Sequence, residues 1–134
     1  MKYLKLFNES QNFLIEGLSD FFQELEDDYN FQIEIYPIRK GVNDIIIEGK
    51  IDISDHVPII FNLVKRMENM SEFRLISLDA NIIIGNNEID KTQHSWVITP
   101  ENLKERIDYL NKLRSSLPHY RVDRLRLIVI DGNN

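Results

Sequence analysis

A polypeptide of 134 residues, 43% hydrophobic and 28% charged, is long enough for one globular domain with its own core. The chain has no cysteine, which excludes disulfides, thiolate nucleophiles, iron–sulfur clusters and cysteine-ligated zinc. Its apolar runs, such as Ile45-Ile46-Ile47, are far shorter than the ~20 residues that span a bilayer, and no signal-peptide core follows the N-terminal lysines. We therefore expect a soluble, cytoplasmic protein without membrane contact.

The formal net charge of −6 is distributed unevenly along the chain. Residues 1–30 carry two lysines against seven carboxylates, a net charge of −5. Residues 104–126 carry seven basic side chains against three acidic ones, a net charge of +4. An acidic chain is repelled by nucleic acid at long range, although a local basic face can still bind it. The acidic and basic segments are either two contact surfaces or two solvated faces.

The first part of the chain predicts a helix followed by a β-hairpin. Apolar residues at helical spacing predict the helix over 10–28, with Ser10 as its N-cap. Gly17 falls on the apolar face of this helix, where it would admit a closely packed neighbour. Alternating apolar and polar residues then predict two antiparallel strands, 31–38 and 45–53.

A second helix is expected over 55–70, and its apolar residues again recur at helical spacing. Asp55 is its expected N-cap, which places Pro58 at the third helical position, where a missing N–H costs nothing. The next segment predicts strands over 73–78 and 81–84, or one bent strand that includes both.

The C-terminal part predicts a strand, a helix and a final strand. A short strand is expected over 94–98. The triplet Thr99-Pro100-Glu101 then starts a third helix, which continues to about Leu117, because a hydroxyl cap, a proline at N1 and an early anion favour a helix start. The last strand, 120–130, is apolar on both faces at its centre, which indicates an interior strand.

The expected fold class is α+β, with the order α-β-β-α-β-β-β-α-β. Short connections between strands indicate a mainly antiparallel sheet, with the three helices packed on one side of it. Residues 1–134 form a single domain in this interpretation, and residues 1–9 are an N-terminal arm or edge strand. The apolar residues of the arm would pack on the sheet edge or mediate self-association: Tyr3, Leu4, Leu6 and Phe7.

Histidines and carboxylates do not form a recognisable catalytic motif in this sequence. No G-x-S-x-G, H-E-x-x-H or glycine-rich phosphate loop occurs. His56 follows Asp52 and Asp55, and such a cluster is either a metal site or the polar start of a helix, of which we favour the helix start. We expect no catalytic residue, metal or cofactor. An enzyme would need a pocket that joins His56 or His119 to two carboxylates.

The strongest binding signal is a basic cluster near the C-terminus. Arginine binds phosphate or carboxylate with two parallel hydrogen bonds, and tyrosine stacks on bases. Strand alternation predicts that Arg124, Arg126, Ile128 and Ile130 share one face of the last strand, and that Tyr120 lies on the same face. The cluster either pairs with carboxylates on neighbouring strands or binds an acidic protein or nucleic acid. Its members are Arg114, His119, Tyr120, Arg121, Arg124 and Arg126.

The N-terminal sequence Met-Lys-Tyr-Leu-Lys-Leu-Phe-Asn-Glu-Ser resembles the opening of small proteins encoded by large tailed bacteriophages. In T-even-type phages, a similar leader targets internal proteins to the prohead. The prohead protease of those phages prefers Leu or Ile, any residue, Glu and a small residue, a pattern that Leu14-Ile15-Glu16-Gly17 matches. The resemblance implies a phage origin and a candidate processing site between Glu16 and Gly17.

The sequence therefore favours a non-enzymatic, phage-type protein that binds another protein, in the virion or prohead or in a host system that it modulates. Its expected location is the host cytoplasm or the virion. Self-association through the N-terminal arm is one form of this hypothesis. The alternative is a nucleic-acid-binding protein that uses the basic C-terminal strand.

Overall fold

The computed structural model describes the backbone of residues 2–3, 9–85, 89–114 and 119–132. No helix among these residues is long and apolar enough to cross a membrane. In chain order the elements are β1 (Lys2–Tyr3), α1 (Glu9–Tyr29), β2 (Gln32–Arg39), β3 (Val42–Ile51), α2 (Ile53–Met70), β4 (Phe73–Gly85), β5 (Lys91–Val97), α3 (Leu103–Arg114) and β6 (His119–Asp131).

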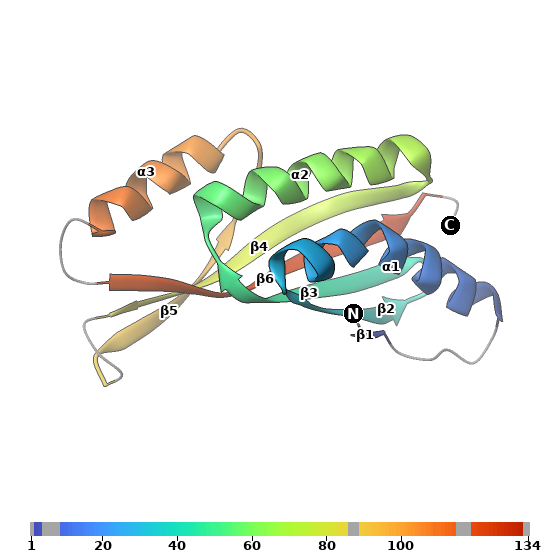
Figure 1. The fold of residues 1–134 in the computed structure, drawn as a ribbon, viewed down its shortest axis with the longest axis horizontal. Coiled ribbons are helices and arrows are strands. Elements are labelled where there is room, and N and C mark those ends of the chain that lie inside the picture. The colour runs from blue at the N-terminus through green and yellow to red at the C-terminus, as the bar shows by residue number, and fades with distance from the viewer. Residues whose placement is uncertain (1, 4–8, 86–88, 115–118, 133–134) are drawn as a thin grey trace.

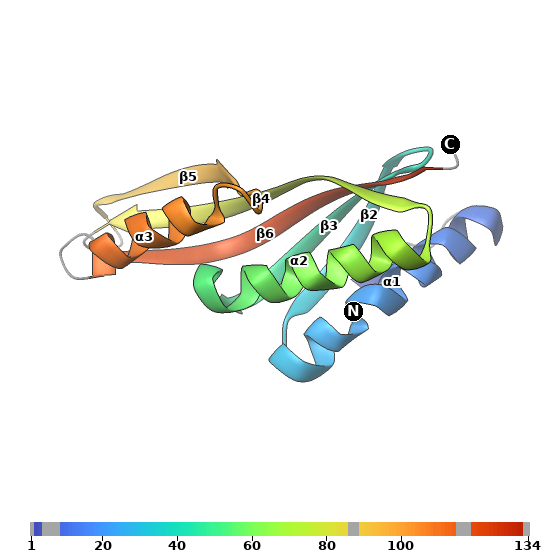
Figure 2. The same cartoon turned by 90° about the horizontal axis from the view of Figure 1, so that it is seen from above.

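The strands form one sheet in the order β1-β2-β3-β6-β4-β5 (Figure 1). Each neighbouring pair is antiparallel except β1 with β2, which is parallel. Figure 2 shows that all three helices lie on the same side of this sheet. The expected α+β fold, the hairpin of the first two long strands and the interior position of the last strand are confirmed.

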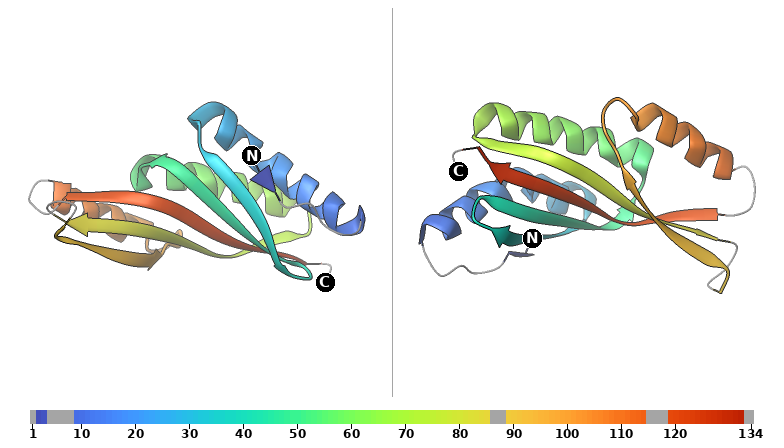
Figure 3. Two further views of the ribbon diagram at one scale, coloured as in Figure 1. Left: turned by 90° about the horizontal axis from the view of Figure 1, so that it is seen from below. Right: turned by 180° about the vertical axis from the view of Figure 1, so that it is seen from behind.

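β4 and β6 are the longest strands and connect the two ends of the molecule (Figure 3). Their ladder runs from the pair Phe73–Asp131 to the pair Gly85–His119. At one end β3 flanks β6, and at the other β5 flanks β4. Residues 73–85 therefore form one strand, which settles the choice between one bent strand and two.

The core lies between the sheet and the helices. Its largest fully buried side chains are supplied by both layers, in agreement with the expected apolar faces. From the helices they include Leu18, Phe22, Leu25, Ile60 and Met67, and from the strands Ile33, Ile35, Ile45 and Ile47. Among the residues that the structure describes, no neighbouring element lies within 4 Å of the position that a Cβ would take on Gly17. The expectation of a closely packed neighbour at Gly17 is therefore wrong.

Helix α3 packs on the far end of the sheet through Leu103, Ile107 and Leu110, of which Leu110 is 2% exposed, and through aromatic contacts. The Trp96 ring on β5 lies edge-on to Tyr109, with 5.5 Å between the ring centroids, and the Arg106 guanidinium lies 5.1 Å from its centre. Thr99 and Asn102 close the turn that precedes the helix, because the Thr99 Oγ1 accepts from the Asn102 N–H and the Asn102 Oδ1 accepts from the Thr99 N–H. The helix itself begins at Leu103, so the start expected at Thr99-Pro100-Glu101 is three residues too early.

The starts of the other two helices also differ from the expectation. Helix α1 begins at Glu9, so Ser10 lies inside it and is not the N-cap. Helix α2 is capped by Asp52, whose Oδ1 accepts from the backbone N–H groups of Ser54 and Asp55 at 2.9 and 3.1 Å. Asp55 therefore lies in the first turn and Pro58 in the helix interior. The cost is one backbone hydrogen bond, since Pro58 has no N–H to donate.

Candidate interaction surface

The face of the sheet opposite the helices is not covered by any other described element (Figure 2). Alternation along β6 shows which side chains reach it. Leu125, Leu127 and Val129 are fully buried under the helices. The residues between them point to the uncovered face: Arg124, Arg126, Ile128 and Ile130.

Six apolar side chains gather at one end of this face, and we call them the open-face patch: Tyr36, Ile38, Val42, Ile76, Ile128 and Ile130. The strand register brings them together. Val42 pairs with Ile130. Ile128 pairs with Asp44, which is also the partner of Tyr36, and with Ser77, which follows Ile76. Ile38 and Ile76 lie at register shifts and are 52% and 59% exposed. Contiguous exposed apolar side chains of this kind mark interaction sites.

The arginines of β6 lie beside this patch and are not all available to a partner. The Arg126 Nε donates to both Asp44 oxygens, at 2.8 and 2.9 Å. That hydrogen bond, with the nearby charges of Asp44 and Asp79, raises the pKa of Arg126 above its ordinary value. Arg124 has Glu48 as its neighbour on β3 and Asn81 as its neighbour on β4. For Arg126, the expectation that the basic cluster pairs with carboxylates on neighbouring strands is therefore confirmed.

A double-mutant cycle on Asp44 and Arg126 should give a coupling free energy of about 1 kcal/mol or less. The Arg126 side chain is 47% exposed and that of Asp44 only 14%, so solvent weakens a pair whose geometry is good. Urea unfolding of Asp44→Asn, Arg126→Gln and the double variant measures the coupling. A coupling above about 2 kcal/mol would contradict the small contribution expected of an exposed pair.

Tyr120 does not share the face of Arg124 and Arg126, so this expectation is wrong. The register of β6 shifts at Asp123: Arg124 pairs with Asn81, whereas Val122 pairs with the next residue, Ile82. This β-bulge adds one residue and reverses the alternation before it. Tyr120 consequently packs against the core.

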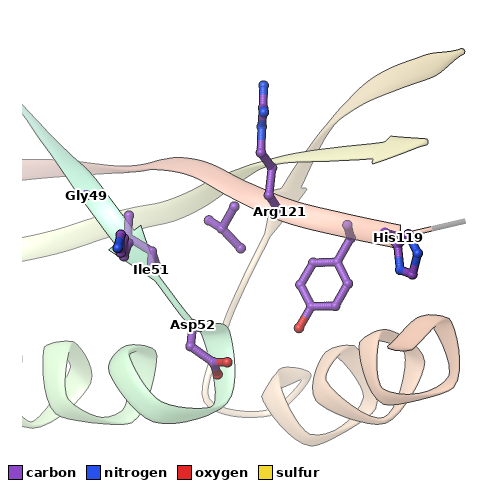
Figure 4. A pocket seen from close by; sticks show the side chains of 8 residues that line it. Gly49, Ile51, Asp52, His119 and Arg121 are labelled. Carbon is purple, nitrogen blue, oxygen red and sulfur yellow. The ribbon is translucent and has the colours of Figure 1, made fainter. Parts of the chain in front are cut away.

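A pocket of about 500 Å³ lies where the end of β3 diverges from the start of β6 (Figure 4). Eight residues line it: Gly49, Lys50, Ile51, Asp52, His119, Tyr120, Arg121 and Val122. Figure 4 shows the Arg121 side chain directed away from the helices and Asp52 at the start of α2. The pocket thus brings together three members of the predicted basic cluster, with a lysine and the carboxylate that caps α2.

His56 takes part in the cap of α2. Its Nδ1 accepts from the Asp52 N–H at 2.8 Å, so the ring proton of the neutral form is on Nε2. The His56 ring also lies edge-on to Phe31 and Tyr29. Of the two alternatives for this cluster, a metal site or the polar start of a helix, these contacts correspond to the helix start. Among the residues that the structure describes, no three metal-ligating side chains form a group that could hold a metal ion.

The remaining predicted residues lie apart from this surface or outside the described part of the chain. Tyr3 belongs to β1, which pairs with β2 at the sheet edge. Glu16 and Gly17 lie within α1, so the bond between them is helical backbone. Arg114 ends α3. Leu4, Leu6, Phe7 and the side chain of Arg114 lie outside what the structure describes.

The acidic end of α1 also makes a contact within the molecule. Glu24 forms an ion pair with Arg66 on α2, and the partners are 40% and 62% exposed. Glu24 therefore meets a basic group of its own chain.

The open-face patch was only partly visible in the sequence. Ile128 and Ile130 were expected beside the arginines, whereas Ile38 and Ile76 reach the face through irregularities of β2 and β4. No family model, curated protein or solved structure matches the chain.

Proposed function

We propose that this chain is a non-enzymatic protein-binding protein and that the uncovered face of its sheet is the contact surface. The open-face patch carries the proposal, because its apolar side chains face solvent although all three helices pack on the other face. An apolar centre flanked by polar and charged groups, here Asp44 and Arg126, is the usual composition of a protein interface.

Nucleic-acid binding is the weaker candidate for the same surface. The open face carries four carboxylates, Glu34, Asp44, Glu48 and Asp79, beside four arginines, Arg39, Arg74, Arg124 and Arg126. Carboxylates repel the phosphate backbone, and the best-placed arginine already binds Asp44. The displacement of Tyr120 to the core side also removes the expected stacking group from this face.

A phage origin belongs to the same proposal and is supported by the N-terminal resemblance alone. Under it, the protein would act in the virion or prohead, or on a host protein during infection. The proposal on binding rests on the sheet and stands independently of that origin.

Affinity capture by the tagged chain from a bacterial lysate that also contains the untagged chain tests the proposed function. The tagged chain should retain a protein after nuclease treatment, whereas Ile128→Glu should lose it, because a charge at the patch centre cannot be desolvated cheaply. Ile89→Glu is the matched control, because Ile89 is 96% exposed and precedes β5, away from the patch. Capture that nuclease abolishes would favour nucleic acid, and capture unchanged in Ile128→Glu would contradict the role of the open face.

A further inference from the structure

We infer that the occupant of the open-face patch is a second copy of this chain, so that two sheets stack face to face with their helices outside. This inference rests on the proposed function and identifies the partner. Three properties of the face carry it: its area, its charge and its arrangement around Ile128.

The area of the face is sufficient for a specific interface. Four strands, β2, β3, β6 and β4, lie side by side along the segment Arg124–Ile130 and make the face about 19 Å wide at ~4.8 Å per strand. The seven residues from Arg124 to Ile130 make it about 23 Å long at ~3.3 Å per residue. The flat footprint is about 440 Å², or about 900 Å² for two stacked copies, and the accessible surface of projecting side chains exceeds this flat projection, which brings the buried area to about the ~1,000 Å² of a specific interface.

The charge of the face permits two identical copies to meet. Each chain carries −6, so most pairs of surfaces on two copies repel each other. Along the segment Arg124–Ile130 of the open face, the four carboxylates are offset by four arginines, Arg39, Arg74, Arg124 and Arg126, which leaves no net charge. Contact through this face therefore keeps most of the excess negative charge of each chain away from the partner.

The arrangement of the patch suits a two-fold axis. In a symmetric dimer each residue meets the partner's equivalent surface, so the patch must be complementary to itself. Ile128 lies on β6, inside the sheet. The pair Ile130 and Val42 lies on one side of it, and Ile76 lies next to Ser77, the partner of Ile128 on β4. Branched side chains from two such faces interdigitate in stacked sheets, which pack about 10 Å apart. Ile128 would then lie near the axis.

Two other exposed surfaces are less suited to a second copy. Strand β5 is at the edge of the sheet formed by the described residues, but its exposed side chains are mainly polar, from Lys91 to Ser95. The outer side of α3 carries charged residues of both signs, including Lys104, Glu105, Asp108 and Lys112. Neither surface offers the apolar area that stabilises a dimer.

Sedimentation equilibrium over a concentration series tests the inference. We expect twice the monomer mass for the wild-type chain and for Ile89→Glu, and an increase of about 30-fold or more in the dissociation constant for Ile128→Glu. Added salt should strengthen the dimer, because it screens the repulsion between two chains of charge −6. If circular dichroism shows that Ile128→Glu is unfolded, Ile76→Glu tests the same patch, since Ile76 is 59% exposed.

Cross-linking locates the interface directly, because the chain has no cysteine of its own. Ile128→Cys should form an intermolecular disulfide under mild oxidation, and Ile89→Cys should not. A wild-type monomer, or a dimer that survives both glutamate variants, would overturn the inference. If the wild-type chain is a monomer and lysate capture still depends on Ile128, the proposed function stands with a different partner. If neither depends on Ile128, both proposals fail.

Discussion

Replacing Ile47 with alanine is expected to lower the free energy of unfolding by about 2–5 kcal/mol. The Ile47 side chain is fully buried, on a strand that has β2 on one side and β6 on the other. Because both neighbouring strands are held by their own ladders, the core cannot readily close around the cavity. Urea denaturation followed by circular dichroism measures the loss.

The adjacent residue provides a matched control for this prediction. Ile46→Ala removes the same atoms from a side chain that lies on the open face, in register with Arg126. We expect a loss of about 1 kcal/mol, since less apolar surface leaves water there on folding. Equal losses for Ile46 and Ile47 would show that the two faces of the sheet are not as different as the structure indicates.

Gly49→Ala is expected to destabilise the protein by about 2–4 kcal/mol, for two independent reasons. The φ angle of Gly49 is +151°, a conformation that L-residues with side chains rarely adopt. An added Cβ would also lie 2.6 Å from Cδ1 of Phe31, which is itself 4% exposed. The backbone or the Phe31 ring must therefore shift. Thermal unfolding with calorimetric analysis would quantify the change.

Gly17→Ala should have the opposite sign. Gly17 lies inside α1 with open space where a Cβ would be, so alanine gains helix propensity without a clash. The expected gain is about 0.5–1 kcal/mol. A destabilised Gly17→Ala variant would indicate that another surface packs against this helix, for example in an assembly.

Much of the fold was predictable because the hydrophobic pattern is regular. The alternation in 31–38 and 45–53 and the helical spacing in 10–28 and 55–70 each correspond to a described element. The predicted starts of the helices were less accurate, because several neighbouring residues can each serve as the N-cap. Asp52 and Asp55 are both suitable N-caps, and the hydrogen bond from the Asp52 N–H to His56 favours the earlier one.

The candidate site was less predictable, because β-bulges interrupt the alternation. Strand parity predicted the face of Arg124, Arg126, Ile128 and Ile130, all of which lie after the bulge at Asp123. Tyr120 lies before the bulge and was assigned to the wrong face. A bulge has no strong signature in a single sequence, since an extra residue in one strand is visible only against its partner.

The position of β6 has a consequence for how the protein is synthesised. This strand follows every other described element in the chain, yet it lies between β3 and β4. Until it leaves the ribosome, the β2–β3 and β4–β5 hairpins have unpaired inner edges and an incomplete core. The sheet therefore cannot close before β6 has emerged, and the nascent chain must keep two apolar strand edges from aggregating until then.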